Sequence, residues 1–404
     1  MKLAEQLLAF AVLLALLAQF RYVRSQRKQL ERSIAGLKRT LVGMYSNGGM
    51  SSKAEEKKTR EKEDQEALPE CLKTGMIRNL WLKHGLRKVE KAEIAESLQD
   101  LTLIIPTHRR HPYLARALDF YRGWRLQIIV TDSSEETFRE VFSRQVHYLH
   151  RPGVSFAKKL KEVIEMVRTP FVLLAADDDF ISPVGVDRAI RYLQTHPECA
   201  CAQGWHSAFS RIRPNRIKWL SIHLFVKKHA VDSRDPVSRV LFQSELYMNN
   251  FYALHRTPVL KDYFCRVCNE LPENLLACRP DLLEIGQALT TVAWGHHVVL
   301  PGLWIAREML ADSAGARVLE PPPDDKSAEI FFAALADTLA SRFPGSNPQE
   351  VFVSALVRYR RFQQRWNNLE IPHFGSIDKV ISNSSDRAVM SSMMAAIQRH
   401  PFVG

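Results

Sequence analysis

Residues 171–183 read Phe-Val-Leu-Leu-Ala-Ala-Asp-Asp-Asp-Phe-Ile-Ser-Pro, an apolar run that stops at three consecutive aspartates. A short apolar run without polar alternation predicts a strand buried on both faces, as in a parallel sheet covered by helices. The aspartates then lie at the carboxyl end of the strand, which is the edge of an open α/β sheet where ligands bind. The alternative is an acidic surface turn, although such turns seldom follow so apolar a strand.

These aspartates, Asp177, Asp178 and Asp179, predict a site for a hard divalent cation. Carboxylates this close in sequence repel one another at neutral pH, so a compensating cation is expected beside them. Mg²⁺ and Mn²⁺ prefer oxygen ligands, and Mg²⁺ commonly takes one or two carboxylates and completes its shell with substrate phosphates and water. The expected cofactor is therefore Mn²⁺ or Mg²⁺.

Length and composition indicate a globular protein with anionic partners. A chain of 404 residues holds two ordinary domains, or one large domain with appendages. Hydrophobic residues make up 46% and charged residues 25%, which are globular values. The net charge of +12 favours nucleotide phosphates or anionic lipid. Nucleic acid is not an expected partner, because the positive residues are dispersed and no nucleic-acid motif accompanies them.

The six cysteines are too sparse for a secreted disulfide framework, which indicates a reducing compartment. Cys265-x-x-Cys268 is compatible with half of a zinc site. No second Cys-x-x-Cys or His pair completes it, so buried free thiols are expected instead.

Residues 3–20 are almost wholly apolar, which makes them a marginal membrane span. A signal-peptide core or a docking helix are the alternatives. Basic residues follow the segment in place of a cleavage site, so a retained anchor is favoured. By the positive-inside rule the rest of the chain then lies at the cytoplasmic face of a membrane.

The remaining composition divides the chain into successive segments. A charged stretch poor in apolar residues separates the start of the chain from the main domain, and a segment with three consecutive prolines separates that domain from a helical end. The expected organisation is a possible anchor (1–24), a helical and charged linker (25–68), a helical lead-in (69–99), the main domain (100–310), a linker (311–326) and a helical C-terminal region (327–404).

The main domain shows the order of a parallel α/β sheet. A buried strand over 101–106 is followed by helical spacing from Pro112 to Tyr121, and a second apolar run over 126–130 ends at Thr131-Asp132. Strands that alternate with helices and end in polar groups imply right-handed crossovers and parallel pairing.

Four pieces of this order carry a family resemblance: Ile104-Ile-Pro-Thr-His-Arg-Arg110, Ile129-Val-Thr-Asp132, Gly153-x-Ser-x-Ala-Lys158 and Ala176-Asp-Asp-Asp-Phe-Ile-x-Pro183. Over residues 100–310 the chain resembles the nucleotide-sugar glycosyltransferases of the GT-A fold. The resemblance is greatest to the family 2 type, and within it to a bacterial subfamily with a triple-Asp motif. It implies a Rossmann-like, mostly parallel sheet with helices on both faces.

The resemblance also implies nucleotide-binding roles. Pro106 and Thr107 would lie beside the base, and Asp132 would accept a hydrogen bond from the base imide. Asp177 would hold the ribose or a water, while Asp178 and Asp179 would bind the metal. The common Asp-x-Asp-Asp pattern is broken at Ala176, which leaves the division of these tasks open. A helix cap is the alternative role for Asp132.

Other positions carry two interpretations each. Arg109 would contact a phosphate or the base, or be simply solvated. Lys158 would meet the diphosphate near a helix start, or belong to an amphipathic helix face. Gly204 and Trp205 would line the sugar pocket, although Trp205 also suits an ordinary core. His255-Arg256 and Arg307-Glu308 are candidates for diphosphate or acceptor contacts, or surface pairs of little energetic weight.

Catalysis in such enzymes needs a base for the acceptor hydroxyl, and one carboxylate suffices if the reaction inverts. The matching stretch is Pro280-Asp281-Leu-Leu-Glu284. Glu284 is the preferred base and Asp281 the second choice. An acid followed three residues later by Glu is also typical of a capping box.

The sequence thus predicts an inverting, divalent-metal-dependent glycosyltransferase. It would move a sugar, with a UDP-sugar as the preferred donor, to a hydroxyl of a glycan or lipid-linked acceptor. A nucleotidyltransferase is a second possibility, but it would bring a Gly-rich loop after the first strand, and residues 107–112 contain no glycine. A third is a catalytically silent, membrane-tethered scaffold that binds nucleotide without turnover.

Overall fold

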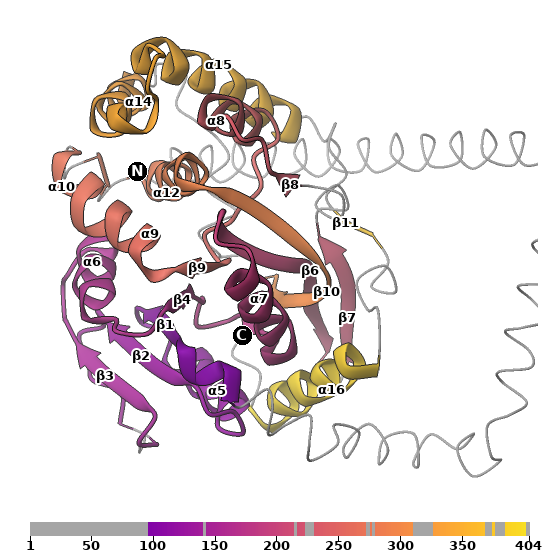
Figure 1. Cartoon of the computed structure of the whole chain (residues 1–404). Helices are drawn as coiled ribbons and strands as arrows, with labels where there is room; N and C mark the ends of the chain where they lie inside the picture. Colours follow the sequence, from indigo (N-terminus) through magenta and orange to yellow (C-terminus); the bar gives the residue numbers. More distant parts are fainter. Residues whose placement is uncertain are drawn as a thin grey trace, which may run out of the picture. The chain divides into compact units, whose positions relative to one another are not determined.

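The structure is a computed structural model (Figure 1) that describes residues 96–139, 143–213, 216–222, 230–271, 275–276, 279–309, 326–367, 374–375 and 384–400. The predicted anchor, charged linker, most of the helical lead-in and nearly all of the 311–326 linker lie outside these residues. Within them, no helix combines the length and the apolar character that crossing a membrane would require.

One half of the sheet is parallel, as the sequence predicts. Strand β1 lies between β2 and β4, and β3 continues the sheet beyond β2. Thr107 pairs in register with Asp132, so the carboxyl ends of β1 and β2 meet at one edge. The bounds are β1 Leu101–Thr107, β2 Gln127–Asp132, β3 Val146–His150 and β4 Phe171–Leu174.

The other half of the sheet is mixed. Strand β9 lies antiparallel between β4 and β6, whereas β10 runs parallel to β6 and also pairs with the short β5. The pairing of Ala306 with Phe180 brings the end of β10 beside the segment that follows the three aspartates. The bounds are β5 Phe180–Ile181, β6 Cys199–Arg213, β7 Arg216–Ile222, β8 Ala230–Val231, β9 Leu254–Arg256, β10 His296–Glu308 and β11 Phe374–Gly375.

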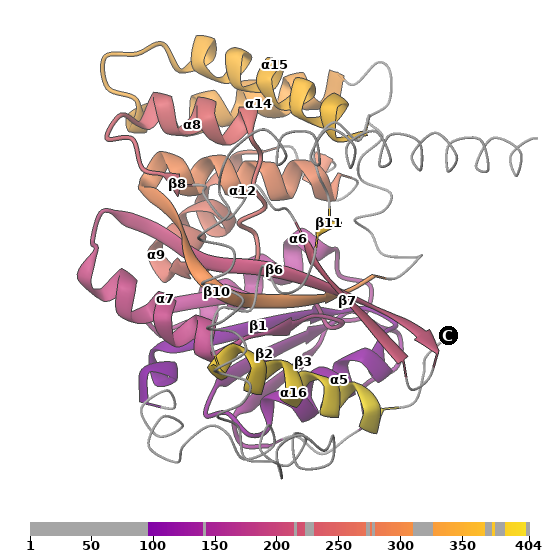
Figure 2. The ribbon, with the colours of Figure 1, turned by 90° about the vertical axis from the view of Figure 1, so that its right-hand side faces the viewer.

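Helices cover both faces of the sheet, and two apolar cores separate them from it (Figures 1 and 2). Alternate residues of β1 serve the two cores, since Leu103 and Ile105 belong to one and Ile104 to the other. The first core holds α5 (His111–Tyr121), α7 (Pro183–Thr195) and α16 (Ser384–Arg399). The second holds α6 (Phe156–Met166), α9 (Thr257–Lys261) and α12 (Pro280–Trp294).

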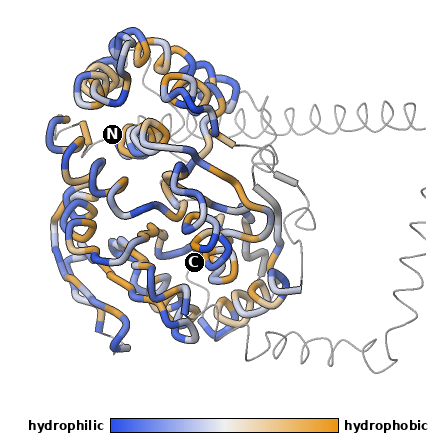
Figure 3. The backbone as a smooth tube through the Cα atoms, in the orientation of Figure 1, coloured by the Kyte–Doolittle hydropathy of each residue, from blue (hydrophilic) through white to orange (hydrophobic). Residues whose placement is uncertain are grey.

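An outer helical layer extends the second core. Helices α8 (Pro236–Glu245), α14 (Lys326–Thr338) and α15 (Pro348–Asn367) lie beyond α12 in Figure 2. In Figure 3, α14 and α15 alternate between hydrophilic and hydrophobic residues, as expected of helices with one buried face. The helices predicted for the C-terminal region therefore form, and they join the two cores of the main domain.

Short helices complete the described part of the chain. A π-helix (Asp262–Val267) and α10 (Cys268–Glu270) continue α9, and single 3₁₀ turns cover Leu98–Asp100 and Ala340–Arg342. Cys265 and Cys268 are free, partly buried thiols on this π-helix and α10. Neither belongs to a group of three metal-ligating side chains among the described residues.

Candidate active site

The three aspartates form a buried acid loop, defined as Asp177, Asp178 and Asp179, between β4 and β5. Their exposed fractions are 4%, 6% and 2%. Buried carboxylates are costly unless opposite charge or hydrogen bonds compensate them. Thr107 at the end of β1 supplies one such bond, because its Oγ1 donates to Asp177 Oδ2 at 2.7 Å. The acidic surface turn that the sequence left open is therefore not what forms.

Two arginines supply the opposite charge. Arg110 Nε lies 3.2 Å from Asp177 Oδ1, and its Nη2 donates to Asp178. Arg307 Nε lies 3.2 Å from Asp179 Oδ2, yet that oxygen receives no directed hydrogen bond. Burial raises the pKa of Asp177 and of Asp179 above the usual carboxyl range, and the arginine charges oppose this only in part. The two arginines therefore do not fully compensate the negative charge of the acid loop.

A buried arginine of α5 braces the loop from the protein interior. Arg116 is 2% exposed, donates through Nη1 to Glu308 and through Nη2 to the backbone oxygen of Asp178 at 3.0 Å. Its guanidinium lies 5.2 Å from the ring centroid of Tyr113 and 5.1 Å from that of Phe180. The sequence gave no indication of this role, because Arg116 and Glu308 are 192 residues apart.

Asp132 lies at the same edge but is satisfied by the protein itself. Its Oδ1 accepts from the Ser134 amide at 2.8 Å and from the Ser134 hydroxyl, and its Oδ2 accepts from the Tyr148 hydroxyl at 2.7 Å. His111 Nε2 lies 2.7 Å from the same Oδ2. Burial favours the neutral acid, but these bonds outweigh it and lower the pKa of Asp132. Residues 133–139 form bends and irregular backbone, so the helix-cap alternative is not observed.

Glu284 and Asp281 differ in their surroundings although both lie in the first turns of α12. Both oxygens of Asp281 accept from Arg279, at 2.9 and 2.7 Å. Glu284 is partly exposed and accepts one hydrogen bond, at 3.1 Å from Asn249 Nδ2. The residue at the helix cap is Arg279, so no capping box is seen.

Arg307 links Glu284 to the acid loop electrostatically. Burial raises the pKa of Glu284 to about 7, and the nearby Arg307 charge opposes that rise. The same guanidinium pairs with Asp179. Arg307 thus pairs with Asp179, and its charge also acts on Glu284.

Residues 102–264 match the family model described as Glycosyl transferase family 2. The matched span includes Asp132 at the end of β2, and the acid loop with the strands β4 and β5 on either side of it. This span of the chain is similar to the family 2 glycosyltransferases. Sugar transfer is therefore its class of reaction, and α12 with Glu284 follows the matched span.

Two solved structures show distant likenesses to this chain. S. aureus TarS, solved with UDP-GlcNAc, is 15% identical over 67% of this chain and 74% of its own, with a TM-score of 0.46. The mannosyltransferase PcManGT from Pyrobaculum calidifontis, solved with GDP-Man and Mn²⁺, is 12% identical over 80% of this chain and 96% of its own, with a TM-score of 0.36. These values are too low to transfer a ligand or a site geometry to the transferase domain. A search of curated proteins found no significant match.

Lys158 and Arg109, the two basic residues predicted for the transferase site, are both exposed, and in each case the next residue in the sequence is the more buried one. Lys158 is exposed, whereas Lys159 is buried and donates to the Thr107 backbone oxygen at 2.6 Å and to Ser133 Oγ at 3.1 Å. Burial lowers the pKa of Lys159 to about 8. Likewise Arg109 is exposed and pairs with the exposed Glu135, while the adjacent Arg110 faces the acid loop.

The remaining predicted residues of the transferase domain lie along the sheet. Pro106 is partly exposed in β1, next to Thr107. A side chain at Gly204 would place its Cβ 2.8 Å from the Gly302 oxygen, so close packing of β6 on β10 requires glycine there. Trp205 is half-buried and packs against the first core, in agreement with the core interpretation.

Asp178 and Asp179 fit a hard cation by the nature of their donors. Both offer carboxylate oxygens, and Asp179 Oδ2 is buried without a directed hydrogen bond. Oxygen donors of this kind suit Mg²⁺ or Mn²⁺.

Proposed function

We propose that the chain is an inverting glycosyltransferase that binds a nucleotide-sugar with the help of Mn²⁺ or Mg²⁺ and transfers the sugar to a hydroxyl acceptor. A UDP-sugar is the preferred donor, and a glycan or lipid-linked molecule the acceptor. The observation that carries the proposal is Arg307, whose charge acts on both Asp179 and Glu284. This shared charge supports a single site for the donor-binding acids and the candidate base.

Glu284 is assigned as the general base. A base works best when its pKa lies near the working pH, and burial has raised that of Glu284 to about 7. The acceptor oxygen forms the new bond to the anomeric carbon, the bond from that carbon to the diphosphate oxygen breaks, and the hydroxyl proton passes to Glu284. Asp281 is less suited, because Arg279 occupies both its oxygens.

Asp178 and Asp179 are assigned to the cation. When bound there, the cation would supply positive charge that stabilises the leaving nucleoside diphosphate. Arg110 and Arg307 add positive charge at the same edge of the sheet. The buried Arg116 keeps the backbone of Asp178 in place through its hydrogen bond to the carbonyl oxygen.

The nucleoside is assigned to the ends of β1 and β2. Thr107 and Asp177 are joined there, and Lys159 holds the Thr107 oxygen from the second core. Asp132 already has donors for both oxygens, so a hydrogen bond to a base imide requires His111 or Tyr148 to give up its place. This exchange is a specific requirement of the proposed donor site.

The cellular setting is a proposal that rests on sequence. The net charge of +12 and the basic residues after residue 20 support a location at the cytoplasmic face of a membrane.

The test is turnover with a donor panel. The full chain is incubated with UDP-, GDP-, CDP- and dTDP-sugars, with and without Mn²⁺, and release of nucleoside diphosphate is measured. We expect release from one nucleotide class, dependent on the cation and abolished in Asp178→Asn/Asp179→Asn. The surface variant Glu245→Gln, which changes an exposed pair with Arg358, is the matched control.

Two results would count against the proposal. Turnover that survives the double substitution would remove the acid loop from the donor site. Tight nucleotide binding without release from any donor, tested with glycan and lipid-linked acceptors, would favour the catalytically silent scaffold.

A further inference from the structure

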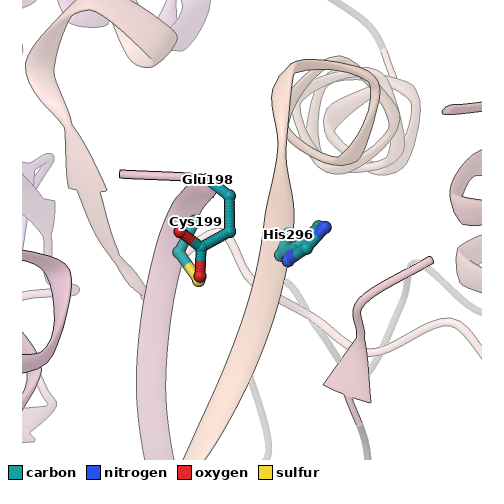
Figure 4. Close-up of side chains that lie close together, drawn as sticks. All are labelled: Glu198, Cys199 and His296. Carbon is teal, nitrogen blue, oxygen red and sulfur yellow. The ribbon is translucent and has the colours of Figure 1, made fainter. Parts of the chain in front are cut away.

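A second group of metal-ligating side chains lies at the far end of the strands from the acid loop. Among the residues that the structure describes, Glu198, Cys199 and His296 place one ligand atom each within 4.8 Å of one another (Figure 4). Cys199 begins β6 and His296 begins β10, whereas Arg307 of the acid-loop site lies near the opposite end of β10. The two groups are therefore separate sites.

The backbone already holds these three residues together. His296 N donates to the Glu198 oxygen at 2.9 Å, and His296 pairs in register with Cys199. A Cβ at Gly295 would lie 2.5 Å from the Glu198 oxygen, so glycine is required for this close approach. The three ligand atoms, which lie within 4.8 Å of one another, must still move closer to bind one ion.

The Cys199 sulfur is buried beside a carboxylate oxygen. Cys199 is 3% exposed, and its Sγ lies 3.9 Å from Glu198 Oε1. A metal bound here would take the thiolate form of the cysteine, so binding would release the thiol proton.

One positive side chain also lies near the Cys199 sulfur, where it would repel a bound cation. Arg256 is the nearby positive charge, and its guanidinium donates to the backbone oxygens of Cys199, Leu193 and His196. Glu198, whose Oε1 lies beside the sulfur, supplies negative charge that offsets this single guanidinium.

We propose that Glu198, Cys199 and His296 bind Zn²⁺, with a water molecule as the fourth ligand. Sulfur, imidazole and carboxylate donors suit zinc, whereas Mg²⁺ and Mn²⁺ prefer oxygen alone. Ligand atoms around a tetrahedral zinc lie about 3.5 Å apart, so the present spacing must close slightly. The ion joins the start of β6 to the start of β10, the strands that carry Gly204, Trp205 and Arg307 further along.

Cobalt provides the direct test, because Co²⁺ replaces zinc and gives a thiolate charge-transfer band. The full chain is reduced, treated with a chelator and titrated with Co²⁺, then with Zn²⁺ in competition. We expect a thiolate band that Zn²⁺ removes, that Cys199→Ser abolishes and that His296→Gln weakens at least tenfold in apparent affinity. Zn²⁺ should also raise the melting temperature of the wild type but not of Cys199→Ser.

The controls separate this site from the others. Cys201→Ser removes a fully buried thiol two residues along the same strand and should keep the band. Asp178→Asn/Asp179→Asn should keep it as well, so failure of the donor site leaves this test intact. Absence of a thiolate band, its persistence in Cys199→Ser, or equal loss in Cys201→Ser would each overturn the proposal.

Discussion

The ends of β2 and β4 both carry buried acids at the same edge of the sheet, but they are compensated differently. Asp132 receives neutral donors from Ser134 and Tyr148, together with His111, and its pKa falls below the usual value. Asp177 and Asp179 depend on Arg110 and Arg307, and burial still raises their pKa values.

This difference separates two uses of a buried carboxylate. Hydrogen bonds that fully satisfy a carboxylate stabilise its charge without a ligand. Arginines at 3.2 Å compensate the negative charge of the acid loop only in part. A divalent cation bound there would therefore stabilise the ionised aspartates further. Substitution of Asp132 at the end of β2 should therefore change mainly the free energy of unfolding. Substitution of the acid loop after β4 should change mainly ligand binding.

Glu284→Gln should have the largest effect on turnover. Loss of a general base costs about 10²- to 10⁴-fold, while nucleoside diphosphate affinity should stay unchanged because the acid loop is intact. In the wild type, kcat/KM should rise as pH rises through about 7, since only ionised Glu284 accepts a proton. Steady-state kinetics across pH measure both. An unchanged pH profile in Glu284→Gln would assign that ionisation to another group.

Arg116→Met should destabilise the fold by about 3 to 5 kcal/mol, because it removes a buried positive charge that pairs with the buried Glu308. Urea unfolding measures this loss. The double variant Arg116→Met/Glu308→Leu removes both charges and should recover part of the stability. Equal stability of the single and double variants would show that the pair matters only through packing.

Asp132→Asn should cost about 1 to 3 kcal/mol, because an amide cannot accept from all the donors that now converge on the carboxylate. The same unfolding assay measures it. A variant as stable as the wild type would mean that the hydrogen-bond network around Asp132 is not what holds the end of β2.

Arg110→Gln should have the smallest effect, a gain of about tenfold in Mn²⁺ affinity without nucleotide, since a competing charge on Asp177 and Asp178 is removed. Calorimetric titration of Mn²⁺ alone measures this gain. Weaker Mn²⁺ binding would show that Arg110 orders the acid loop for the cation and does not compete with it.

Local pattern was enough to predict the strands and the convergence of their ends. The apolar run of β4 and the alternation of strands and helices brought Thr107, Asp132 and the acid loop to one edge. The preference for Glu284 over Asp281 as the base stays a prediction; the two acids differ in that Arg279 pairs with Asp281, whereas Glu284 accepts from Asn249.

The arginines could not be predicted in the same way. Arg116 and Arg307 meet the acid loop only after distant elements pack. Nothing in the local sequence marks Arg116, and Arg307 is marked only as one of two candidate pairs for diphosphate or acceptor contacts. In the pair Lys158-Lys159, one helical step of about 100° decides which side chain is buried. That step depends on exactly where α6 begins, which sequence patterns fix poorly.

The most direct test is calorimetric titration of the nucleoside diphosphate that the donor panel selects, with and without Mn²⁺, on the wild type, Asp132→Asn and Asp178→Asn/Asp179→Asn. We predict Mn²⁺-dependent binding that the double variant loses and that folded Asp132→Asn keeps at least in part. Binding that is indifferent to Mn²⁺ and survives in the double variant would contradict the assignment of the acid loop to the donor site.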